Sequence, residues 1–322
     1  MKKSILQLAP QTYSRHLIHG PDRIWAETNC YTDLWIELLH ALGHEPIAAL
    51  PFTLAIDFEG DQWTFFKFPL ADLYELYGLD VQELAIWKSL IEHVEEQVTL
   101  GRPVLVEVDS FYLPDTHGTA YQTAHTKTTI AIVEIDVENN HLGYFHNQGF
   151  YNLNGNDFTH LFRLHMQDDI YLPPYVEFVK VWENKKTQAQ LLETSINLLR
   201  RQLKLLPTKN PFDTFTTRLT KDVDWLTGEP METFHQYSFV TLRQFGACYE
   251  LSKTYLQWLE QNGQTGLSGT IEIFNELSTS AKTIQFQLAR AVSKKKPLDL
   301  SSLEKMGQSW QTAMDTLLNL YP

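Results

Sequence analysis

The sequence predicts an α+β chain in two parts, a mixed or antiparallel sheet domain in residues 1–184 and an all-helical bundle in residues 185–322. Charge divides the chain at this point, because residues 1–184 carry 10 basic and 26 acidic side chains while the rest carries 16 and 13. The apolar pattern changes there too, from short β-rich runs to apolar residues spaced three and four apart. A length of 322 residues is enough for two such domains.

Six short runs rich in β-branched and aromatic residues predict the strands of the first domain. They cover residues 52–58, 63–68, 103–109, 128–136, 142–146 and 176–181. The polar segment DVENN between the fourth and fifth runs favours an antiparallel hairpin.

A helix is predicted to begin at Cys30, in the segment WAETNCYTDLWIELLHALGHEP. Asn29 is a good N-cap, and Gly43 supplies the left-handed residue that ends many helices. Unpaired N–H groups at a helix start favour a thiolate and can bind an oxyanion, so Cys30 is the candidate nucleophile, with its own N–H and Asn29 as the oxyanion site. Most free cysteines are only small core residues, and Cys248, in the middle of a predicted helix, is expected to be one.

A cysteine nucleophile needs a base and a group that orients this base. His125 stands just before the predicted strand 128–136 and is the candidate base. In the expected hairpin Asn147 would lie near His125 and orient its ring, with His146 and Asp136 as alternatives for this third position. The chain order Cys, His, Asn is typical of papain-like enzymes, so the first domain is predicted to be papain-like.

The runs WAETNCYTDLWIELLHALG and VLVEVDSFYLPDTHGTAYQTAHTKTTIAIVEID resemble a bacterial family of unknown function that carries a placeholder domain name. More distantly, residues 25–150 resemble the N-terminal domain of the butirosin biosynthesis protein H family. These are acyltransferases that move an aminoacyl group from a carrier-protein thioester to an amine, and their papain-like relatives include cysteine peptidases. The resemblance implies that Cys30 is the nucleophile, that His125 is the base, and that Asp109 and Tyr112 shape the pocket.

The favoured function is therefore acyl transfer through a Cys30 thioester, from an acyl or aminoacyl carrier protein to a small amine. Phosphopantetheine would belong to that substrate, and no cofactor is expected. Asp57, just before a turn-like EGDQ segment, is a further candidate for binding the amine. Where the relatives often end a strand in Asp-Pro this chain has Asn147, which is neutral and stabilises an imidazolium less than a carboxylate would.

Two alternatives share the same fold. A cysteine peptidase, amidase or thioesterase would use the same three residues with water as the acceptor. A non-enzymatic binding module would keep the papain-like scaffold without the reaction, and its helical part would bind a partner.

Composition argues against several other classes of protein. A net charge of −13 does not suit a surface that binds nucleic acid. The acids of the segment IDFEGDQW lack the glycine and final glutamate of a calcium loop, and two distant cysteines cannot form a zinc cluster, so no metal is expected. No apolar run reaches 18 residues, so the expectation is a cytoplasmic protein without a membrane span.

Overall fold

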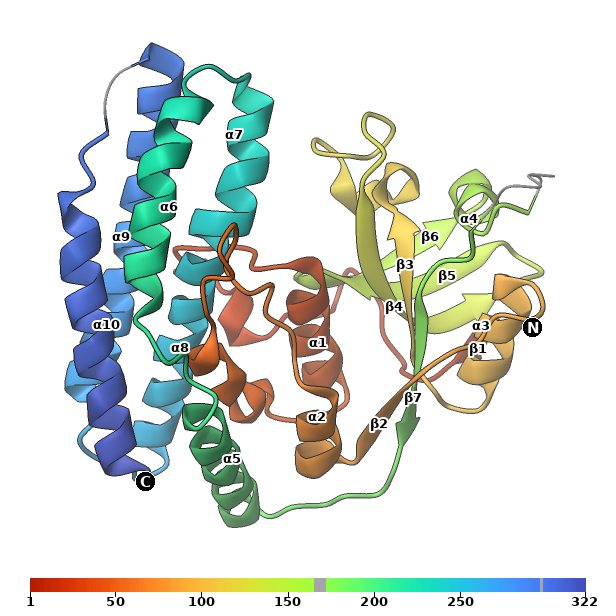
Figure 1. The fold of residues 1–322 in the computed structure, drawn as a ribbon. Coiled ribbons are helices and arrows are strands. Elements are labelled where there is room, and N and C mark those ends of the chain that lie inside the picture. The colour runs from red at the N-terminus through yellow and green to blue at the C-terminus, as the bar shows by residue number, and fades with distance from the viewer. Residues whose placement is uncertain (165–171, 296–297) are drawn as a thin grey trace. The chain divides into compact units, whose positions relative to one another are not determined.

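The computed structural model describes residues 1–164, 172–295 and 298–322, which form an α+β chain with an antiparallel sheet and a helical C-terminal region (Figure 1). The chain folds into two compact units. Unit 1 contains residues 1–20, 29–46 and 70–185, and unit 2 contains residues 21–28, 47–69 and 186–322. No helix within the described ranges is both long and apolar enough to cross a membrane.

Unit 1 is built on an antiparallel sheet of seven strands. The strands are β1 (Lys3–Ser4), β2 (Leu79–Glu83), β3 (Val104–Asp109), β4 (Lys127–Asp136), β5 (His141–His146), β6 (Gly149–Asn154) and β7 (Val176–Val181). Their order in the sheet is β2-β7-β3-β4-β5-β6, and β1 pairs with β4. The predicted hairpin between β4 and β5 is confirmed, since the two strands pair antiparallel.

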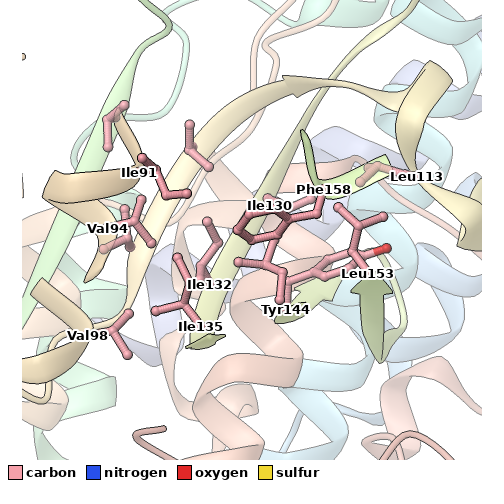
Figure 2. Packing of buried hydrophobic residues seen from close by; sticks show 14 of the residues in the cluster. Ile91, Val94, Val98, Leu113, Ile130, Ile132, Ile135, Tyr144, Leu153 and Phe158 are labelled. Carbon is pink, nitrogen blue, oxygen red and sulfur yellow. The ribbon is translucent and has the colours of Figure 1, made fainter. Parts of the chain in front are cut away.

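One face of this sheet is covered by helix α3 (Leu90–Thr99) and the short helix α4 (Asn156–Leu161). Figure 2 shows Ile91 and Val94 of α3 beside Ile132 of β4, and Phe158 of α4 belongs to the same buried cluster. Alternation along each strand sends the remaining side chains to the opposite face, where helix α1 (Cys30–Ala41) contacts β4, β5 and β6. A smaller helix, α2 (Leu70–Tyr77), packs on β2.

Helix α1 begins and ends where its sequence predicts. The side chain of Asn29 accepts a hydrogen bond from Thr32 N at 2.9 Å, and Gly43 has a φ of +80° just beyond the helix. The apolar face consists of buried Tyr31, Leu34, Trp35, Leu38 and Leu39 and half-buried Leu42.

The strand predictions hold only in part. Runs 103–109, 128–136, 142–146 and 176–181 are confirmed as β3, β4, β5 and β7, and the sequence did not indicate β2 or β6. The predictions for 52–58 and 63–68 are wrong, because a 3₁₀ turn spans Pro51–Ala55 and only an isolated bridge joins Phe58 to Trp63. Proline at the start of a turn favours this helical geometry, and the apolar side chains are buried in the helical unit.

Unit 2 is a bundle of helices. These are α5 (Gln188–Leu203), α6 (Pro211–Leu226), α7 (Met231–Ser238), α8 (Gln244–Gln261), α9 (Ser268–Lys294) and α10 (Ser301–Leu320), with a π-helical turn at Phe239–Arg243 between α7 and α8. Residues 47–69 are part of the bundle core, where the Trp63 ring contacts Phe215 and Phe245. Cys248 is fully buried and donates to Thr53 O at 3.3 Å, as a structural residue would.

Candidate functional site

A cavity of about 520 Å³ lies where β3 ends and β4 begins in unit 1. Its polar wall comes from these two strands, from the segments that follow β3 and precede β4, and from His160 and Arg163 at the end of α4. Its apolar wall is made by Leu90, Leu161, Leu172 and Pro174. The cavity therefore combines an ionisable side with an apolar side, which is typical of a site for small molecules.

Two candidate residues, His125 and Asp109, meet in the wall of this cavity. Strand pairing places Asp109 opposite Lys127, two residues after His125, and the Nδ1 atom of His125 lies 2.6 Å from Oδ2 of Asp109. Phe111 stacks on the imidazole with ring centroids 4.3 Å apart. A carboxylate can only accept, so Nδ1 is the donor in this contact, and in the neutral imidazole Nε2 is the acceptor. The His125 ring is 67% exposed.

The rest of the polar wall contains an ion pair of opposite charges and a second pair of stacked rings. Lys127 Nζ lies 2.6 Å from Oε1 of Glu107. Tyr112 stacks on His160 with centroids 5.3 Å apart and planes 5° apart. Tyr112 lines the cavity together with Asp109.

Cys30 is the first residue of α1 and is half-buried. The hydroxyl of the next residue, Tyr31, donates to Oε2 of Glu177 at 2.8 Å, and Glu177 pairs with Leu105 of β3. The start of α1 therefore lies over the face of β3 that carries Leu105. Asp109 follows four residues later in the same strand and so belongs to the same face. Within the described ranges, Cys30 neither lines the cavity nor hydrogen-bonds to His125.

The proposed oxyanion groups are at the same helix start. Cys30 N–H is the first of the helix, where the α-helical pattern provides no carbonyl to accept it. The side-chain oxygen of Asn29 already accepts from Thr32 N, so this oxygen acts as the helix cap. Asp57 belongs to unit 2, where it accepts from Phe58 N at 2.7 Å, and burial raises the pKa of Asp57.

The candidates for orienting His125 are placed elsewhere. Asn147 lies in the turn between β5 and β6 with a φ of +46°, and no hydrogen bond between described residues joins it to His125. Asp136 accepts from Asn139 at the opposite end of β4, nine residues from its start. His146 is occupied in a buried network.

That network is the main feature of the site that sequence reasoning missed. Asp115 accepts a hydrogen bond from Tyr144 at 2.5 Å and contacts Nδ1 of His146 at 2.5 Å, while Nε2 of His146 lies 2.7 Å from Thr128 Oγ1. Asp115 belongs to the segment between β3 and β4 that also carries His125. The network therefore fixes this segment to the sheet. The sequence analysis named His146 as a candidate to orient His125 but did not indicate its contact with Asp115.

Comparison with known families covers almost the whole chain. The DUF1839 N-terminal domain matches residues 14–181, and the DUF1839 C-terminal domain matches residues 188–319. A search of curated proteins found no match.

Proposed function

The chain belongs to the DUF1839 family, and from the chemistry of its N-terminal domain we propose that it transfers an acyl group from a thioester to an amine through Cys30. The observation that carries this proposal is the His125–Asp109 pair in the wall of the cavity. A histidine oriented by a carboxylate is the base that acyl-transfer enzymes use.

The pair suits the proton transfer that an amine acceptor requires. An amine that attacks a carbonyl must lose a proton, and Nε2 of His125 is free to accept it. Asp109 stabilises the imidazolium that results, since a carboxylate 2.6 Å from Nδ1 offsets the new positive charge. In this proposal Asp109 takes the orienting role that the sequence analysis gave to Asn147.

Cys30 is proposed as the nucleophile because of its position at the start of α1. Its side chain lies at the positive end of the helix dipole, where the negative charge of an attacking sulfur is stabilised. The hydrogen bond from Tyr31 to Glu177 supports a location above the β3 face that carries Asp109. A nucleophile on a helix start and a base at the start of a strand in the sheet below are the papain-like arrangement we infer for unit 1.

The reaction has two steps that balance. The Cys30 thiolate bonds to the carbonyl carbon of the donor thioester, and the donor sulfur leaves as a thiolate. The amine nitrogen then attacks the same carbon, the bond to Cys30 Sγ breaks, and the amine proton moves to Nε2 of His125. The Cys30 N–H would stabilise the oxyanion in both steps.

Intact-protein mass spectrometry tests the proposal. Wild-type protein is incubated with a panel of aminoacyl and acyl pantetheine thioesters and should gain the mass of one acyl group. Cys30→Ala should gain none, while Cys248→Ser should load as the wild type does, because its buried thiol only donates to Thr53 O. Loading of Cys30→Ala equal to the wild type, or no loading with any donor, would overturn the proposal.

The acceptor is tested on the loaded protein. Adding a small amine should remove the acyl mass and release the amide, and a His125→Gln variant should load but retain the acyl group. Loss of the acyl mass at the same rate without an amine would replace the transferase with a thioesterase or amidase that uses water. The exposed face of the His125 ring makes this the necessary control.

A further inference from the structure

We propose that unit 2 contains a binding site for a phosphate group, separate from the acyl-transfer site. The site is a pocket of about 190 Å³ lined by Trp25, Ala26, Glu27, Arg243, Lys282 and Gln285. The charged residues of this lining are two cations and a single carboxylate, so the pocket carries an excess of positive charge. This charge is notable in a chain with a net charge of −13.

Lys282 is the less compensated of the two cations. Its Nζ lies 4.2 Å from the ring centroid of Trp25 and 5.8 Å from that of Phe286. Within the described part of the chain, no carboxylate lies at ion-pair distance from this ammonium. Burial, followed by the charge of the nearby Arg243, lowers the pKa of Lys282, while the charge of Glu250 acts in the opposite direction. An anion between Lys282 and Arg243 would relieve the repulsion of these two cations.

Arg243 is held in place but incompletely neutralised. Its Nε donates to Thr28 O at 3.3 Å, and Nη2 lies 3.4 Å from Oε2 of Glu27, a carboxylate that is 47% exposed. An exposed ion pair of this length contributes little. The guanidinium also lies over the ring of Phe239, 5.2 Å from its centroid, which orients it. Guanidinium and ammonium groups together are a common pair for phosphate oxygens.

Residues around the pocket fix its walls in place. Glu250 accepts from the backbone N–H groups of Ile24 and Trp25, at 2.8 and 3.0 Å. The Trp25 indole donates to Ser278 Oγ at 3.1 Å, and a Cβ at Gly246 would lie only 2.5 Å from the indole ring. A glycine at this position lets the indole pack directly on α8. The cations are therefore positioned before any ligand binds.

The π-helical turn Phe239–Arg243 contributes to the same positioning. It ends at Arg243, and π-helical turns are rare and frequently found at functional sites. Phe239 and Phe286 remain 37% and 66% exposed beside the two cations, so an organic group attached to the phosphate would find apolar surface there. The pocket volume equals that of about six water molecules, which is room for a phosphate and a few further atoms.

The test measures thermal unfolding of the full-length protein in inorganic phosphate and in sodium chloride of equal ionic strength. Wild-type protein should unfold at a higher temperature in phosphate, and Lys282→Met should lose this gain because methionine keeps the packing on Trp25 without the charge. The matched control is Lys253→Met, since Lys253 is in the same bundle and donates to Asn275. This control should keep the gain. No gain in phosphate over chloride, or a gain in Lys282→Met equal to that of the wild type, would overturn the proposal.

Two further ligands identify the source of the phosphate group. Phosphopantetheine, the arm of carrier proteins, is compared with pantetheine, which lacks the phosphate. If phosphopantetheine stabilises the protein more than inorganic phosphate and pantetheine has no effect, the group is bound as part of that arm. Equal effects of phosphopantetheine and inorganic phosphate would indicate free phosphate, while an equal effect of pantetheine would contradict a phosphate site. Cys30→Ala should be stabilised by phosphate as the wild type is. Failure of the acyl-transfer proposal is therefore distinguishable from failure of the phosphate-site proposal.

Discussion

The Oδ2 atom of Asp109 lies 2.6 Å from Nδ1 of His125, although sixteen residues separate them in the chain. The antiparallel pairing of β3 with β4 creates this contact, because Asp109 is opposite Lys127. Asp109 also accepts from Phe111 N at 3.0 Å, so one carboxylate both begins the turn after β3 and orients the imidazole. The first prediction concerns this second role.

Asp109→Asn should reduce amine transfer on the order of a hundredfold. An amide can still accept from Phe111 N but cannot stabilise the imidazolium form of His125. The unfolding midpoint should change little, since the carboxylate is 35% exposed. The control is Glu107→Gln, which loses a contact to Lys127 in the same cavity without touching His125. Transfer rates that are equal in wild type and Asp109→Asn would contradict the assignment.

The sequence could not specify this pairing, whereas it did specify the helix that carries Cys30. Asn29 and Gly43 are local signals, and their effects on the backbone depend on a few neighbouring residues. The contact of Asp109 with His125 depends on strand register across a long connection, for which no residue is a local marker. Register also explains why Asn147 has no bond to His125: with Ala131 of β4 opposite Phe145, strand β5 ends at His146, before it reaches the level of His125.

The error over residues 52–68 has a different cause. Short runs rich in β-branched and aromatic residues predicted strands there, but such runs are equally compatible with apolar side chains buried in another kind of structure. Their burial is in the helical bundle, where Ser252 and Cys248 of α8 both donate to Thr53 O. The sequence alone cannot show which unit a short apolar segment joins.

The second prediction concerns the two thiols. Iodoacetamide should modify one cysteine in the native protein and two in the denatured protein. Cys30 is half-buried at a helix start, whereas Cys248 is fully buried and its burial raises the pKa of the thiol. Mass spectrometry of peptides locates the label, and Cys30→Ala should take up none in the native state. Labelling of Cys248 before Cys30 would contradict the structure of α8.

The third prediction concerns the buried network behind the cavity. Asp115→Ala should lower the free energy of unfolding by about 2–4 kcal/mol, because the Tyr144 hydroxyl and the His146 ring would lose their shared partner in a buried site. Urea unfolding measures the change. Asp157→Ala, which removes a hydrogen bond to the hydroxyl of Tyr121 at a more exposed position, should cost less than about 1 kcal/mol. If Asp115→Ala lowered the free energy of unfolding by no more than Asp157→Ala does, the buried network would add no stability beyond that of an exposed hydrogen bond.

The fourth prediction uses two glycines in the bundle. Gly246→Ala should destabilise the protein by about 1–3 kcal/mol, since the new methyl group would lie 2.5 Å from the Trp25 ring and 2.8 Å from Cβ of Ala281. Gly269→Ala is the control, because a Cβ there meets nothing within 4 Å and alanine favours helix α9. This control should leave stability unchanged or raise it. Thermal unfolding distinguishes the pair, and a stable Gly246→Ala protein would contradict the close packing of Trp25.

The fifth prediction concerns a buried histidine in unit 1. His19 lies between two carboxylates of α1, with Nδ1 at Oε1 of Glu37 and Nε2 3.3 Å from Oδ1 of Asp33. Burial alone would lower the pKa of His19, but the hydrogen bonds and charges of these carboxylates outweigh burial and raise it to about 9. The ring is therefore expected to be protonated at neutral pH.

This raised pKa gives stability a definite dependence on pH. The unfolded histidine has a pKa near 6.5, so the native state binds an extra proton between pH 6.5 and about 9. The contribution of His19 is fully present below pH 6.5 and is lost as the pH rises toward 9. Urea unfolding at pH 6, 7.5 and 9 should show this decline. His19→Gln should be less stable by about 3 kcal/mol at pH 6, because two buried carboxylates lose their cation, and its decline with pH should be smaller. The prediction would be contradicted if the free energy of unfolding of the wild type rose between pH 6.5 and 9 and that of His19→Gln changed by the same amount. Such a result would mean that His19 is not protonated in the native state.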